Sequence, residues 1–204
     1  LPTGSRKRVH LTSALGLEFE LLRRRCEEPQ PGRRAACPLF WTCGGNQVGK
    51  GALAGWKLLQ EERADDTWYW PFSGSLGSLV DRPGDVIIET YPAEMYAHLD
   101  LGPVVGKGDQ PVRRRCADAL LAVARKLDVR LDPELKSDII DGFSFGDDAF
   151  DAVVGLFGIL NVLLGRRPEG VPDDCAVTEI EGWILGQAAP MFAKHELDGQ
   201  FTST

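Results

Sequence analysis

Residues 146–154 read GDDAFDAVV, with three aspartates at the head of an apolar run that is predicted to be helical over 147–164. Asp148 and Asp151 stand three residues apart, so they share one face of that helix. Like charges at this spacing repel each other by about 0.2–0.5 kcal/mol on an isolated helix. A divalent cation such as Mg²⁺ or Mn²⁺ would turn the repulsion into attraction, because these ions prefer carboxylate oxygen.

A purely structural explanation of the aspartates is also open. Acidic residues favour the first turn of a helix because of its dipole, and Asp147 or Asp148 would serve as a cap. The face below them favours a site instead, because it continues as Ala152, Gly155 and Gly158. Glycine inside a helix costs about 1 kcal/mol relative to alanine. Two glycines on one face therefore predict that another backbone packs closely there.

A third carboxylate, Glu89, lies near the end of the most strand-like run of the chain, DVIIET at residues 85–90. If this strand is the backbone that packs on the glycines, Glu89 approaches Asp148 and Asp151. The three residues are therefore the predicted ligands of one or two Mg²⁺ or Mn²⁺ ions, which is a hypothesis at this point.

Composition places the chain among ordinary globular proteins and excludes several classes. The 204 residues carry a net charge of −7 and the pI is near 5.0, which argues against tight non-specific binding to nucleic acid. No apolar run approaches the roughly 20 residues that span a bilayer, and the basic opening is unlike a signal peptide. Five cysteines without a C-x-x-C pair predict reduced thiols, a cytoplasmic location and no zinc site.

The predicted elements are mostly helices. Helices are expected over 51–63, 93–99, 112–127, 133–140 and 147–164, one short amphipathic helix within residues 11–22, and strands over 85–90 and 176–185, with an extended aromatic segment at 68–72. Few strands among many helices indicate an α/β or α+β fold in which helices cover a small sheet.

Residues 44–50 read GGNQVGK, which satisfies the phosphate-loop pattern G-x-x-x-x-G-K before a predicted helix. The next residue is Gly51, where Mg²⁺ coordination by a nucleotide-binding protein needs Ser or Thr, so a true phosphate loop is disfavoured. A glycine-rich connection is one alternative. The other is a loop that holds a substrate phosphate beside the carboxylates through its backbone amides and its lysine. The residues of this predicted phosphate site are Gly45, Asn46, Gln47, Gly49 and Lys50.

Arginine runs at 23–25, 33–34 and 113–115 all lie in the first part of the chain, whereas the acidic excess lies after residue 128. Such runs are usually solvated surface. A face that contacts nucleic-acid phosphates is the functional alternative.

Four segments together resemble one family. They are LFWTCGGNQVGK at 39–50, ETYPAE at 89–94, DDAFDA at 147–152 and EGWILG at 181–186, in that order. They are similar to domain-of-unknown-function family 429, described as predicted nucleases of the RNase H fold. The resemblance covers about residues 36–187, between a partly helical segment at 1–35 and a tail at 188–204.

The resemblance implies an α/β fold of RNase H type, a mixed sheet flanked by helices, whose first strand with its central aspartate is missing here. It implies a metal-dependent nuclease in which Glu89, Asp148 and Asp151 hold Mg²⁺ or Mn²⁺, and nucleic acid, either DNA or RNA, is the partner. Asp147 would be an outer acid or a helix cap. The missing aspartate favours the alternative of a non-catalytic binding or scaffold domain with the same fold, and a nucleotide-binding protein is the third candidate.

Overall fold

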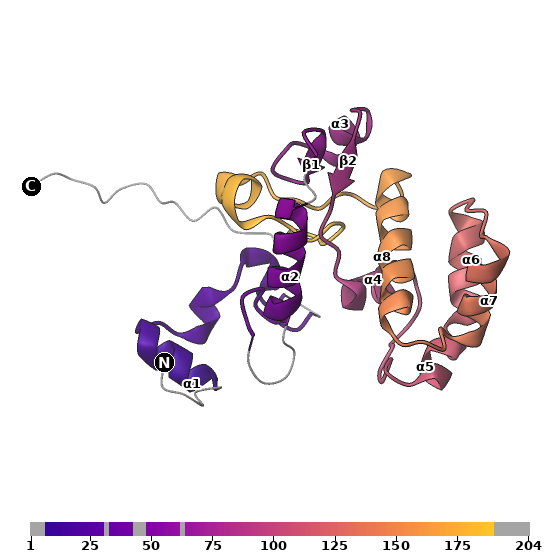
Figure 1. The fold of residues 1–204 in the computed structure, drawn as a ribbon, viewed down its shortest axis with the longest axis horizontal. Helices are drawn as coiled ribbons and strands as arrows, with labels where there is room; N and C mark the ends of the chain where they lie inside the picture. The colour runs from indigo at the N-terminus through magenta and orange to yellow at the C-terminus, as the bar shows by residue number, and fades with distance from the viewer. Residues whose placement is uncertain (1–6, 31–32, 43–47, 62–63, 190–204) are drawn as a thin grey trace, which may run out of the picture.

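The computed structural model describes residues 7–30, 33–42, 48–61 and 64–189, and helices predominate in them (Figure 1). The α-helices are α1 (Arg8–Leu15), α2 (Val48–Glu61), α3 (Leu76–Val80), α4 (Pro92–His98), α5 (Gln110–Arg115), α6 (Ala117–Lys126), α7 (Pro133–Asp141) and α8 (Asp148–Leu163). Short 3-10 turns cover Phe19–Leu22 and Arg25–Glu27, and Val177–Glu181 forms a π-helical turn. None of the helices in the described ranges is long and apolar enough to cross a membrane.

The sheet consists of two parallel strands, β1 (Thr67–Tyr69) and β2 (Asp85–Ile87), joined by a crossover that contains α3. Trp68 is opposite Val86 in the register. The free edge of β1 is closed locally, because the Tyr69 amide donates to the Ser73 hydroxyl at 3.0 Å. The protein is thus a helix-rich molecule of the α/β class with a small parallel sheet.

The predicted final strand at 176–185 is wrong, because Val177–Glu181 is helical. Asp174 explains the difference. Its carboxylate accepts a hydrogen bond from the Ala176 amide at 2.9 Å, and its carbonyl accepts one from the Val177 amide at 3.1 Å, so the backbone turns there. The predicted helix over 112–127 is also divided, since Cys116 separates α5 from α6.

Two apolar clusters form the core. The first joins α4, α6, α7 and α8, which pack side by side in Figure 1, and includes Met95, Leu120, Ile139, Phe150, Val154 and Phe157. The second lies beneath the sheet and includes Cys26, Trp70, Leu76, Leu79, Trp183 and Leu185. Because Cys26 belongs to the second cluster, the N-terminal segment packs into the body of the protein.

The glycine face of α8 packs closely, as the sequence predicts, but against side chains. A Cβ atom on Gly155 would lie 2.9 Å from the Thr90 hydroxyl oxygen, and one on Gly158 would lie 2.3 Å from the sulfur of Met95. The small residues therefore admit Thr90, directly after Glu89, and the first turn of α4. This contact sets where the head of α8 lies relative to the segment that follows β2.

Candidate functional site

The head of α8 holds a group of four polar side chains, one of which is the ammonium of Lys107. The Lys107 Nζ lies 3.2 Å from the Asp147 Oδ2 and donates a short hydrogen bond to the Asp151 Oδ2. The Tyr96 hydroxyl, on α4, donates to the Asp151 Oδ1 at 2.9 Å. The two carboxylates stand four residues apart, which brings them to the same face of the first turn.

Lys107 comes from a Gly- and Pro-rich loop between α4 and α5, and a buried arginine anchors that loop. The Arg113 guanidinium is 2% exposed and donates to the carbonyls of Lys107 at 2.5 Å and Gly108 at 2.9 Å. It also donates to the carbonyls of Gly142 at 2.9 Å and Phe143 at 2.8 Å. Arg113 thus fixes the loop with Lys107 to the turn that precedes α8, and it is no solvated surface charge.

The ion pairs change the acidities of their members. The hydrogen bond from Lys107 holds the pKa of the Asp147 carboxyl below its usual range. Burial alone would lower the pKa of Lys107, but the bonds to Asp151 and Asp147 outweigh burial and raise it. Burial and the bond to Asp151 raise the pKa of Tyr96. These shifts favour the carboxylate form of Asp147, the ammonium form of Lys107 and the protonated phenol of Tyr96.

Glu89 is paired with a different cation. The Arg24 guanidinium donates from Nη1 and Nη2 to the two oxygens of Glu89, both at 2.7 Å. Its Nε donates to Glu27 at 2.9 Å, and Glu27 is 2% exposed. Burial would lower the pKa of Arg24, but the bonds to Glu89 raise it. A bidentate pair of this kind holds both partners in a fixed orientation.

The structure does not bring the predicted ligands Glu89, Asp148 and Asp151 together around one partner. Asp148 is exposed, and its side chain makes no hydrogen bond or ion pair with a described residue. Within the described ranges, no three His, Cys, Asp or Glu side chains lie close enough to hold a metal ion. Asp151 meets Asp147, four residues before it, rather than Asp148. Glu89, Asp148 and Asp151 as joint ligands therefore stay a prediction.

Sequence reasoning missed the cationic partners, Lys107 and Arg24, as well as Tyr96. Lys107 is 44 residues from Asp151 and Arg24 is 65 residues from Glu89. No local pattern marks such pairs. The available signal was the i, i+4 spacing of Asp147 and Asp151, which places two carboxylates on one face as surely as the spacing of Asp148 and Asp151.

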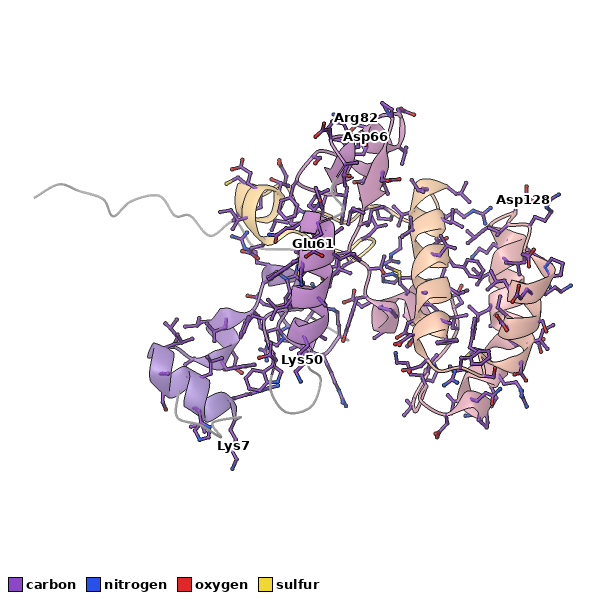
Figure 2. The ribbon with its side chains drawn as sticks, viewed as in Figure 1. Lys7, Lys50, Glu61, Asp66, Arg82 and Asp128 are labelled. Atoms are coloured by element: carbon purple, nitrogen blue, oxygen red, sulfur yellow. The ribbon has the colours of Figure 1, made fainter. Side chains whose placement is uncertain are left out.

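Only two of the predicted phosphate-binding residues, Gly49 and Lys50, are among the described residues; Gly45, Asn46 and Gln47 lie outside them. The Gly49 amide donates to the Trp41 carbonyl at 2.9 Å, which does not fit its predicted role as a phosphate donor. A Cβ on Gly49 would lie 2.6 Å from the Phe40 carbonyl carbon, so close backbone packing explains this glycine. Lys50 is exposed near one end of α2, apart from α8 in Figure 2.

Comparison with known proteins identifies no relative of this chain. No family model matches the chain, and neither a curated protein sequence nor a solved structure is similar to it.

Proposed function

We propose that this chain is a divalent-metal-dependent phosphodiesterase domain of RNase H type that acts on nucleic acid, with its cation site at the head of α8. The observation that supports the proposal is the position of Lys107, whose ammonium lies against two carboxylates of one helical turn. Two aspartate side chains that face one positive charge present the oxygen donors that Mg²⁺ and Mn²⁺ prefer.

The residues at this site fit a cation in part. Asp147 and Asp151 would hold it, and the Tyr96 hydroxyl already orients the Asp151 carboxylate. Asp148 belongs to the same first turn and is exposed. Glu89 would join the set only after its carboxylate leaves Arg24, which now binds both of its oxygens. A bound divalent ion would supply activated water and neutralise charge on the phosphate.

Lys107 has two roles in this proposal. In the free protein its ammonium holds the side chains of Asp147 and Asp151 in place. When a cation takes its position, the ammonium leaves the carboxylates and becomes available to a substrate phosphate, for which lysine is a suitable point charge. Arg113 holds the backbone of this loop at the carbonyls of Lys107 and Gly108, so the change is confined to the side chain of Lys107.

Calorimetric titration with Mn²⁺ tests the site. Asp151→Asn should abolish binding, whereas Asp118→Asn, an exposed aspartate on α6, should leave it unchanged. Lys107→Ala should strengthen binding about tenfold, or about 1.4 kcal/mol, because the ion no longer competes with an ammonium. Equal heats for the wild type, Asp151→Asn and Asp118→Asn would overturn the proposed metal site.

The bidentate pair of Arg24 with Glu89 favours a second candidate, a non-catalytic domain that keeps the fold and binds a partner. In that case Glu89 is a structural residue. The protein should then cleave neither DNA nor RNA, single-stranded or duplex, in the presence of Mn²⁺. Glu89→Gln should lower the thermal stability and have no other effect. Cleavage by the wild type that Glu89→Gln removes would exclude this candidate.

A further inference from the structure

A hollow of about 490 Å³ lies between α3 and the C-terminal end of α8. Figure 1 shows where these two helices lie in the fold. The wall of the hollow is mostly apolar, and its polar members are Arg167 and Glu169. The apolar part comes from Leu76, Val80, Val162, Leu163 and Pro168. Sites for small organic ligands have volumes of roughly 300–1,000 Å³ and combine apolar walls with a few polar groups.

Arg167 is fixed at one end and has unused donors at the other. Its Nε donates to the Gly186 carbonyl at 2.5 Å. A Cβ on Gly186 would lie 3.2 Å from that nitrogen, so the side chain is closely packed there. Its two terminal nitrogens make no hydrogen bond or ion pair with any residue of the described ranges. Guanidinium groups prefer to bind oxyanions with such a pair of donors.

The positive charge of Arg167 is incompletely balanced. Burial lowers the pKa of its guanidinium, and the attraction of Glu94 offsets this only partly. Glu94 is itself bonded to Arg33, whose Nε lies 2.6 Å from its Oε1. A partly buried cation without its own counter-ion is stabilised by any anion that reaches it.

Glu169 does not supply that counter-ion. Its Oε2 accepts hydrogen bonds from the Trp70 Nε1 at 2.8 Å and the Leu76 amide at 3.0 Å, and its Oε1 accepts a second bond from the same amide at 3.1 Å. These three bonds hold the carboxylate against Trp70 and the start of α3. The wall of the hollow therefore combines apolar side chains, a carboxylate that is held by Trp70 and Leu76, and one cation that has donors to spare.

We propose that the hollow between α3 and α8 binds a small amphipathic anion, an aliphatic carboxylate, with its carboxylate on Arg167 and its hydrocarbon chain on the apolar wall. This site is separate from the head of α8, and the proposal does not depend on the function proposed above. Octanoate is a suitable probe because it combines one carboxylate with a flexible chain.

Titration of the full chain with octanoate, followed by the methyl NMR signals of Leu76, Val80 and Val162, tests the proposal. Octanoate should shift these signals in the wild type, and Arg167→Gln should weaken binding at least about tenfold. Arg166→Gln is the matched control, because it removes the same charge from the exposed neighbouring residue. Its affinity should equal that of the wild type.

Two further measurements keep the test informative if Arg167→Gln fails to fold. Leu163→Glu changes a 40% exposed residue of the wall and should abolish octanoate binding while the fold is retained. Octan-1-ol, which lacks the charge, should bind at least about tenfold more weakly than octanoate. No shift with octanoate, equal binding of octanol, or equal loss in Arg166→Gln and Arg167→Gln would overturn the proposal.

Discussion

Around α8 the protein is packed with apolar side chains, whereas around Glu89 it is joined by ion pairs. In the first region Phe150, Val154 and Phe157 have no exposed surface. In the second, three arginines of the N-terminal segment each bind at least one acid from a distant part of the chain. The pairs are Arg24 with Glu27 and Glu89, Arg25 with Asp174 and Glu181, and Arg33 with Glu94.

The difference teaches how each region depends on its sequence. An apolar core tolerates changes that keep volume, and loses free energy in proportion to the cavity that a truncation leaves. An ion pair contributes little net free energy, but loss of one partner leaves a buried charge behind. Arg24, Arg25 and Arg33, which belong to the arginine runs, thus have a structural role. The sequence alone had allowed phosphate binding as an alternative role for these runs.

The largest expected effect is in the apolar region. Phe157→Ala should lower the free energy of unfolding by about 4 kcal/mol, because it removes a fully buried ring from the centre of the first cluster. Phe145→Ala, at a fully exposed ring, should change it by less than about 0.5 kcal/mol. Urea unfolding of both variants measures the two changes in the free energy of unfolding. Similar losses for Phe157→Ala and Phe145→Ala would contradict the proposed core.

The next effect is in the ion-paired region. Arg24→Met should cost about 3 kcal/mol, because Glu27 would remain buried with its charge unpaired. Arg115→Met removes an exposed arginine and should cost almost nothing. Urea unfolding at pH 7 measures both. A loss for Arg24→Met no larger than that for Arg115→Met would show that the ion pairs do not hold this region.

A pH effect is expected at His98, on α4 between the two regions. Burial, and then the charge of Arg167, lower the pKa of His98 to about 4 from its ordinary value near 6.5. Between these values the unfolded chain binds the proton and the folded chain does not, so stability falls as the pH falls. From pH 7 to pH 5 the loss should be about 2 kcal/mol.

His98→Leu should remove this loss, because the variant has no proton to bind at that position. His10→Gln, at a histidine of α1, should keep it. Unfolding free energies at pH 5, 6 and 7 for the three proteins check the slope. Equal slopes for the wild type and His98→Leu would mean that His98 is not buried as the neutral form.

The smallest effect concerns the contact that joins the two regions. Gly155→Ala should destabilise by about 1 kcal/mol, because its methyl group would meet the Thr90 hydroxyl. In a Thr90→Ala background the same change should stabilise by up to about 1 kcal/mol, as alanine favours helix. Gly55→Ala on α2, where a Cβ has open space, should stabilise in either background.

Local sequence patterns predicted the α/β class and several helices, whereas the RNase H-type sheet stays a prediction. The helices at 51–63 and 147–164 are found as α2 and α8, since amphipathic periodicity and an acidic first turn are properties of short stretches. The strand prediction for residues 176–185 was wrong because the apolar residues there fit either a strand or a helical turn. The hydrogen bond from the Ala176 amide to the Asp174 carboxylate favours the helical turn. The contacts of Lys107 and Arg24 depend on folding at long range, which no local pattern encodes.

The central claim is that the ammonium of Lys107 occupies the position of a divalent cation. NMR of the Lys107 Nζ and the Asp151 carboxyl carbon during Mg²⁺ titration tests it most directly. Both signals should move together with a single dissociation constant, and that of Lys107 should approach the signal of exposed Lys57, whose side chain is 75% accessible. Unchanged signals of Lys107 and Asp151 at the highest Mg²⁺ concentration would contradict the claim.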